Sequence, residues 1–155
     1  YLYKNIGPIN KRHGPEPLDS DFTSKSLFEL IKSKKRNIKA LLLDQSMIAG
    51  LGNIYADESL WKSKIHPNSH SHKIPKKRID NLYNNIRIIL TKAIEQNGTT
   101  IINFAVNGES GKYTNELRVY GKNNSECYYC SHIIVKIRVA GRGTYICKKC
   151  QKKYR

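Results

Sequence analysis

The four cysteines of this chain stand in two close pairs near its carboxyl end. Cys127 and Cys130 form one pair, Cys147 and Cys150 form the other, and sixteen residues separate the pairs. This spacing falls within the C-x2-C-x15–20-C-x2-C window that is typical of zinc-binding segments. Two tight turns that each carry two thiolates can close a tetrahedron around Zn²⁺ with zinc–sulfur distances of about 2.3 Å. Since all four positions are then protein ligands, we expect one structural zinc ion per chain.

Two disulfides or four idle thiols are the alternatives to a zinc site. Disulfides are expected mainly in exported proteins, and no basic-then-apolar signal segment opens this chain. His132 follows the second cysteine closely and is a further potential ligand. Because four thiolates are already available, we expect His132 at the surface.

A Gly-Leu-Gly-Asn turn at residues 50–53 is the second feature that predicts chemistry. Glycines permit positive φ and close backbone approach. Asn53 is expected to cap the following helix, where unpaired N–H groups favour a phosphate. The simpler alternative is a connection between two helices with no ligand. A cationic run precedes the turn, which favours phosphate binding; it consists of Lys34, Lys35, Arg36 and Lys39. Asp57 and Glu58 follow the turn, and we attribute them to the dipole of the helix start.

The charge balance predicts a polyanionic partner. Lys and Arg total 28 against 12 Asp and Glu, which gives a formal net charge of +16 in 155 residues. Small domains ordinarily carry a net charge of roughly 2–8 in magnitude. Charge alone leaves nucleic acid, a membrane surface and an acidic protein as partners. The longest apolar runs are far too short to cross a bilayer.

Apolar periodicity and cap residues predict a mainly helical chain with a small β tail. Thr23 or Ser24 caps the first expected helix, and Asn37 caps the second. The expected helices run from about residue 24 to 35, 38 to 47, 54 to 64, 76 to 96 and 100 to 106. The apolar stripe of the longest one includes Ile79, Leu82, Tyr83, Ile86, Ile89, Leu90, Ala93 and Ile94. Between the cysteine pairs, residues 133–139 and 144–146 read as two strands joined by a turn at residues 140–143, which displays Arg142 at its tip.

These motifs together resemble the carboxy-terminal part of the formamidopyrimidine-DNA glycosylase and endonuclease VIII family. The most specific matches are Ile38-Lys39, Leu43-Asp44-Gln45, residues 49–58, residues 116–121 and the cysteines. The sequence Gly-Asn-Ile-Tyr-Ala-Asp-Glu at residues 52–58 resembles the formamidopyrimidine branch more than the endonuclease VIII branch. The resemblance implies a helix–two-turn–helix bundle followed by a four-cysteine zinc β-hairpin.

The resemblance also implies the damaged-DNA-binding part of a bifunctional base-excision enzyme. Such an enzyme extrudes an oxidised purine (8-oxoguanine or a formamidopyrimidine) from duplex DNA, cleaves its glycosidic bond and cuts the strand as an AP lyase. The partner would be double-stranded DNA with damaged bases or abasic sites.

The family's site residues can be placed on this sequence by their motifs. Lys39 and Asn53 would hold phosphates beside the extruded nucleotide, and Lys35 and Arg36 would contact the backbone nearby. Arg142 would grip the same region, at the position assigned proton donation in δ-elimination, although a guanidinium is a poor acid at neutral pH. The loop that covers the base would be Asn107, Gly108, Glu109, Ser110, Gly111, Lys112 and Tyr113. Lys112 stands where family members often carry an aromatic residue.

The family's nucleophile, an amino-terminal proline amine followed by glutamate, has no match here. None of the five prolines is terminal, and the chain begins at Tyr1. We therefore expect a fragment that binds DNA without catalysing. Its expected parts are a linker at residues 1–22, a helix–two-turn–helix domain at 23–121 and a zinc finger at 122–155.

Two other functional classes stay open. One is a non-enzymatic zinc-ribbon module that binds DNA or RNA, and the other is a structural zinc protein that contacts an acidic protein. A bare zinc ribbon needs no Gly-Leu-Gly-Asn turn between helices, which favours the repair enzyme. We expect a monomer in the cytoplasm of a bacterium, associated with the nucleoid, or otherwise inside a cell.

Overall fold

A computed structural model describes residues 14–96 and 116–155 of the chain. Within these ranges the elements are α2 (Ser24–Ser33), α3 (Ile38–Leu43), α4 (Asn53–Lys62), the 3-10 helix η2 (Ser71–Lys73), α5 (Lys76–Glu95), β1 (Val135–Val139) and β2 (Arg142–Ile146). The expected mainly helical fold with a small β hairpin is confirmed. The helix expected at 100–106 and the loop at 107–113 lie outside the described residues. No helix in the described ranges is long and apolar enough to span a membrane.

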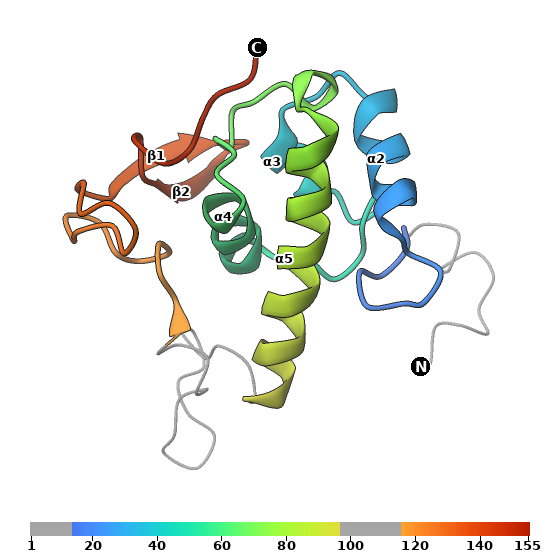
Figure 1. Cartoon of the computed structure of the whole chain (residues 1–155), viewed down its shortest axis with the longest axis horizontal. Helices are drawn as coiled ribbons and strands as arrows, with labels where there is room; N and C mark the ends of the chain where they lie inside the picture. Colours follow the sequence, from blue (N-terminus) through green and yellow to red (C-terminus); the bar gives the residue numbers. More distant parts are fainter. Residues whose placement is uncertain (1–13, 97–115) are drawn as a thin grey trace.

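The long helix α5 forms the centre of the helical body, with α2 on one side and α4 on the other (Figure 1). Its expected apolar stripe is confirmed at the inward positions, which are Ile79, Leu82, Ile86, Ile89 and Ala93. Ile94 is the exception, because Ala93 takes the inward position of that turn and leaves the Ile94 side chain 67% exposed. Ile79, Leu82 and Ile86 join α2, α3 and α4 in the main apolar core, and Ile89 and Ala93 pack with Leu117 in a second cluster.

Local side-chain chemistry sets the ends of the first two helices. The Thr23 side chain accepts from the Ser26 backbone N–H in a capping box, and the Asn37 side chain accepts from the Ala40 N–H, so both expected caps are confirmed. The second helix ends at Leu43, whereas the sequence predicted Met47. The Asp44 carboxylate accepts from the backbone N–H and the hydroxyl of Ser46, which turns the chain out of the helix.

The amino-terminal segment packs on the body where an extended linker was expected. The Gly14 N–H donates to the Gln45 carbonyl at 2.8 Å, and the Ala49 N–H donates to the Pro15 carbonyl at 3.0 Å. A Cβ atom on residue 14 would lie 2.2 Å from the Met47 carbonyl oxygen, so only glycine fits there. The described part of the expected linker, residues 14–22, thus belongs to the folded body.

The strands β1 and β2 form a hairpin with a two-residue loop. Val139 pairs with Arg142 next to this loop. Ala140 and Gly141 have φ of +54° and +74°, which fits the primed turns that join antiparallel strands tightly. The turn is therefore shorter than the predicted residues 140–143. Arg142 begins β2 directly after the tip.

Candidate functional site

The four cysteine sulfurs converge as the spacing predicted. The Sγ atoms of Cys127, Cys130, Cys147 and Cys150 all lie within 4.8 Å of one another. The Cys127–Cys150 pair is 3.8 Å apart and the Cys130–Cys147 pair 3.4 Å. A tetrahedron with zinc–sulfur bonds of about 2.3 Å has edges of about 3.8 Å. The four thiolates therefore fit one zinc ion and leave no position for a water ligand, so the ion is structural.

Each cysteine pair forms a knuckle with the same backbone pattern. The Ser131 N–H donates to the Cys127 carbonyl, and the Gln151 N–H donates to the Cys147 carbonyl. Burial opposes ionisation of the Cys127 thiol. Hydrogen bonds from the backbone N–H groups of Cys130 and Tyr129 act against burial, and the Cys127 pKa is lowered to about 7, so this thiol can ionise to a zinc ligand near neutral pH.

A buried ion pair joins the zinc hairpin to the helical body. The Lys39 ammonium on α3 lies 2.7 Å from the Asp57 carboxylate on α4, and neither side chain is exposed. The same ammonium donates to the Thr144 hydroxyl of β2 at 2.6 Å. The Asp57 carboxylate in turn accepts from the Tyr145 backbone N–H at 3.0 Å. The helices α3 and α4 thus meet β2 at these two charges, although Tyr145 lies 88 residues after Asp57.

The structure places the Lys39 ammonium away from the surface, whereas the sequence predicted a phosphate contact for it. Its ammonium is buried and is saturated by Asp57, Thr144 and the Gly143 carbonyl at 3.4 Å. Burial lowers the pKa of Lys39, and burial raises the pKa of Asp57 to about 6 although the two charges oppose these shifts. Lys39 therefore positions the hairpin through its buried contacts with Thr144 and Gly143.

Glu58 makes a second attachment of the same kind. Its carboxylate accepts three backbone N–H groups, from Arg118, Val119 and Tyr120, at 2.7 to 2.9 Å. Burial raises its pKa, and these three bonds oppose the shift. Asp57 and Glu58 lie beyond the first turn of α4, so the dipole explanation was wrong. The sequence carried a signal for these partners, since adjacent acidic residues occur amid apolar ones in a helix.

Asn53 is the first residue of α4, and Gly52 takes the cap position without a side-chain hydrogen bond. The predicted capping role of Asn53 is therefore wrong. Its amide nitrogen donates to the Gly143 carbonyl at 3.2 Å and approaches the Tyr120 hydroxyl at 3.4 Å. Gly50 has φ of +87° as predicted, whereas Gly52 has an ordinary φ of −93°. A Cβ atom on Gly52 would meet nothing within 4 Å, so the start of α4 is open to an approaching group.

The structure brings Asn53 and Arg142 together across almost ninety residues of sequence, because Asn53 bonds to the residue after Arg142. Arg142 is exposed and close enough to Lys39 to oppose its charge. The other two predicted contacts lie elsewhere. Lys35 neighbours His72 of η2, and Arg36 pairs with Asp44 at 2.7 Å. The site that the structure builds is thus the start of α4 together with the start of β2.

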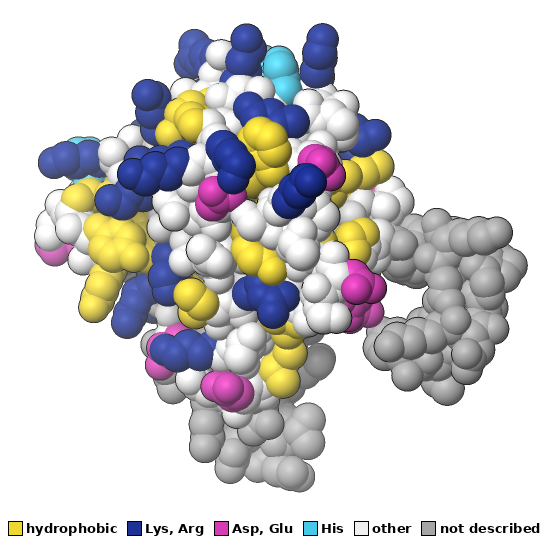
Figure 2. Space-filling view, turned by 45° about the vertical axis from the view of Figure 1, so that its right-hand side comes forward, with side chains coloured by type: hydrophobic (Ala, Val, Ile, Leu, Met, Phe, Trp, Pro, Cys, Tyr) yellow, Lys and Arg dark blue, Asp and Glu magenta, His cyan; other side chains and the backbone are white. Residues whose placement is uncertain are grey.

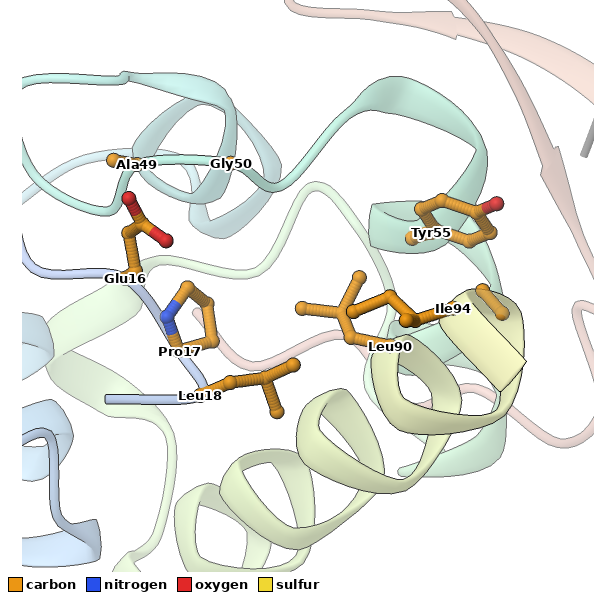
Figure 3. A pocket seen from close by; sticks show the side chains of 9 residues that line it. Glu16, Pro17, Leu18, Ala49, Gly50, Tyr55, Leu90 and Ile94 are labelled. Carbon is orange, nitrogen blue, oxygen red and sulfur yellow. The ribbon is translucent and has the colours of Figure 1, made fainter. Parts of the chain in front are cut away.

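Basic side chains and an apolar pocket are two further features of the surface. On the face shown in Figure 2, Lys and Arg side chains are spread widely over the surface and acidic side chains are few. Beside the Gly50 turn lies a mainly apolar pocket of about 400 Å³ between the amino-terminal segment and the end of α5 (Figure 3). Pro17 and Leu18 face Leu90 and Ile94 across it. The pocket offers no set of metal ligands.

Two family models match most of the chain. Residues 13–105 match the model described as "Formamidopyrimidine-DNA glycosylase H2TH domain". Residues 125–153 match the model described as "Zinc finger found in FPG and IleRS". The second match and the converging sulfurs agree that the cysteines form a zinc finger.

Similar proteins cover nearly all of the chain. A formamidopyrimidine-DNA glycosylase of Lactobacillus acidophilus is 49% identical over 146 residues, which are 94% of this chain and 53% of that protein. A complex of the Lactococcus lactis protein Fpg with DNA containing an abasic site has a TM-score of 0.89 at 42% identity and covers 98% of this chain and 56% of that one. A complex of MutM with DNA containing carbocyclic 8-oxo-G has a TM-score of 0.87 at 43% identity, covering 97% and 55%. The chain spans about half the length of these relatives.

Removal of one partner of the buried ion pair should destabilise the protein strongly. In Asp57→Asn the Tyr145 N–H keeps an acceptor, but the Lys39 charge is left without its counter-ion. We expect a loss of about 3–5 kcal/mol in the free energy of unfolding, measured by urea denaturation of the zinc-loaded protein. Lys76→Gln breaks an exposed pair with Asp80 and is the control, with an expected loss of less than about 1 kcal/mol. Equal losses would contradict the structural role of the buried pair.

Zinc removal should unfold the finger and leave the helical body. Metal binding and folding are coupled in so small a lobe, whereas the main apolar core draws on α2 to α5 and contains no cysteine. We expect one zinc per chain by elemental analysis. On chelation, helical circular dichroism should persist while residues 117–155 become sensitive to protease. A metal-free protein with a protease-resistant tail would exclude the zinc assignment.

Proposed function

This chain belongs to the formamidopyrimidine-DNA glycosylase family, and from that premise we propose that it is the damaged-DNA-binding part of such an enzyme in base-excision repair. The observation that carries the proposal is the meeting of Asn53 and Arg142 at the open start of α4. The relatives solved with abasic-site or 8-oxo-G DNA are consistent with this role. A bacterial protein that acts inside the cell as a monomer fits the proposal.

The proposed contact surface is a phosphate-binding ledge made of the start of α4 and the start of β2. No side chain caps α4, and the partial positive charge at a helix start favours an anion. Arg142 stands exposed beside it and can donate two parallel hydrogen bonds to phosphate oxygens. Asn53 supports this ledge through the Gly143 carbonyl. Lys35 and Arg36 add long-range attraction from outside the ledge.

The chemistry of the whole enzyme is a further part of the proposal. Excision requires the damaged base to leave the stack, and strand cleavage requires an amine that forms a Schiff base with the sugar. The relatives are longer than this chain, and we assign that amine to the part of them that these 155 residues do not match. Within this chain, residues 107–113 would cover the extruded base. Arg142 would steady the phosphate during elimination, and proton donation by Arg142 is the weaker assignment.

Measurements of DNA affinity should distinguish a specific contact of Arg142 from the attraction of a general basic surface. Arg142→Ala should leave zinc content and stability unchanged, because an exposed side chain at a hairpin start buries little. It should weaken binding on the order of tenfold to hundredfold on DNA with an abasic-site analogue, and less on undamaged duplex. Asn53→Ala should cost about 1 kcal/mol of stability through its lost hydrogen bonds. The double variant should lose less affinity than the sum.

Fluorescence anisotropy with both DNAs and a salt series measures these losses. Lys77→Ala removes one exposed cation from the start of α5 and is the matched charge control. Because Lys77 lies outside the proposed ledge, its loss should weaken binding to both DNAs slightly and equally and leave the salt slope nearly unchanged. If Arg142→Ala behaves like Lys77→Ala, the non-enzymatic zinc-ribbon module becomes the better interpretation.

The isolated 155 residues should bind DNA without cutting it. Incubation with duplexes that contain 8-oxoguanine or a formamidopyrimidine should release no base, and borohydride should trap no covalent complex. A full-length relative that carries the amino-terminal proline serves as the positive control. A trapped complex with this chain alone would show that it holds its own nucleophile.

A further inference from the structure

The single tryptophan of the chain, Trp61, lies between the helical body and the zinc site. It projects from α4, is 2% exposed and packs in one cluster with Val119, Ile134 and the cysteines. Its ring stacks on Tyr129 of the first knuckle, with centroids 4.5 Å apart and planes at 6°. Trp61 is thus the part of the helical body that reaches the metal ligands.

The indole nitrogen of Trp61 is buried and has no hydrogen-bond partner of standard geometry among the described residues. An indole N–H can only donate, and a buried donor without an acceptor costs about 1–3 kcal/mol. The buried cluster that holds Trp61 also holds the sulfurs of Cys127 and Cys147. Trp61 stacks on Tyr129, two residues after Cys127, which favours the Cys127 sulfur as the acceptor.

We propose that in the zinc-loaded protein the Trp61 indole N–H donates to the Cys127 thiolate, which makes Trp61 a positioning residue of the metal site. A zinc-bound thiolate keeps negative charge and accepts N–H donors. Groups that hydrogen-bond to metal ligands orient them and tune their donor strength. The stack on Tyr129 fixes the plane of the indole, and the close packing of the cluster fixes its depth.

This contact would link metal loading to the helix that also carries the DNA-facing residues. Asp57 and Glu58, four and three residues before Trp61, hold the hairpin and residues 118–120, respectively. A hydrogen bond from Trp61 adds the first zinc ligand to the groups that α4 positions. The fit of the finger on the body would then depend on one N–H that the zinc-finger motif does not contain.

The test separates the donor from the bulk of the ring. Trp61→Phe keeps an aromatic ring and removes the N–H. Replacement of Trp61 by benzothienylalanine, which has sulfur in place of the N–H, keeps the shape almost unchanged. In both variants we expect zinc affinity to fall by about 10- to 100-fold in competition with a chromophoric chelator. In the cobalt-loaded proteins the thiolate-to-metal charge-transfer band should move to lower energy, because the unbonded sulfur is a stronger donor.

Tyr83→Phe is the control, because it removes a different hydrogen bond, from the Tyr83 hydroxyl to the Phe22 carbonyl in the helical core. It should lower stability without changing zinc affinity or the cobalt band. If Trp61→Phe fails to fold, the benzothienylalanine protein decides the question alone. Wild-type affinity and an unmoved band in that protein would overturn the proposal and leave Trp61 a packing residue.

Discussion

Between α3, α4 and β2 lie a lysine ammonium and an aspartate carboxylate that have no contact with solvent. Removal of two such charges from water costs several kcal/mol for each, and only close pairing with satisfied hydrogen bonds offsets that cost. Lys39 and Asp57 meet this condition only when β2 supplies the Thr144 hydroxyl and the Tyr145 N–H. A hairpin placed a few ångströms away would leave both charges poorly paired. The pair therefore specifies one position of the zinc hairpin on the helical body.

The exposed chemistry depends on that buried position. Arg142 precedes by two residues the hydroxyl that Lys39 holds, and Asn53 precedes Asp57 by one helical turn. Each exposed residue thus stands on a strand or helix that the ion pair fixes. Lys39 acts on the surface through this support, without reaching it. This arrangement explains how a small basic domain can present two groups from distant parts of the chain with a fixed separation.

The sequence predicted what depends on neighbours along the chain. Thr23, Asn37 and the stripe of α5 follow local rules of capping and periodicity, and two cysteine pairs predict a zinc site by their spacing alone. Ile94 was assigned wrongly because periodicity does not show which of two adjacent apolar residues a neighbouring helix covers. The early end of α3 at Asp44 depends on a side chain that competes with the helix backbone.

The contacts that join distant segments could not be predicted from the sequence. Lys39 meets Thr144 across about a hundred residues, and no local pattern states that pairing. A lysine within the run Ile38-Lys39-Ala40-Leu41-Leu42-Leu43 was interpreted by its charge as a DNA contact, although its apolar neighbours indicated burial. Local rules likewise predicted that the Asn53 amide caps a helix. They could not show that this amide donates to the Gly143 carbonyl, because Gly143 lies 90 residues away in the sequence.

The path of the last residues after the zinc finger has a mechanical consequence. The Lys152 N–H donates to the Lys64 carbonyl, the Lys152 carbonyl accepts from the His66 N–H, and the Tyr154 carbonyl accepts from the His70 N–H. Glu58 holds the segment that enters the finger, so the finger is anchored at its entrance and at its exit, on α4 and on the strand-like segment that follows it. A lobe fastened at one point swings on a hinge, whereas a lobe fastened at two points transmits force to its support. A bent ligand that displaces the hairpin would therefore displace α4 as well, so the finger and the helix would move together.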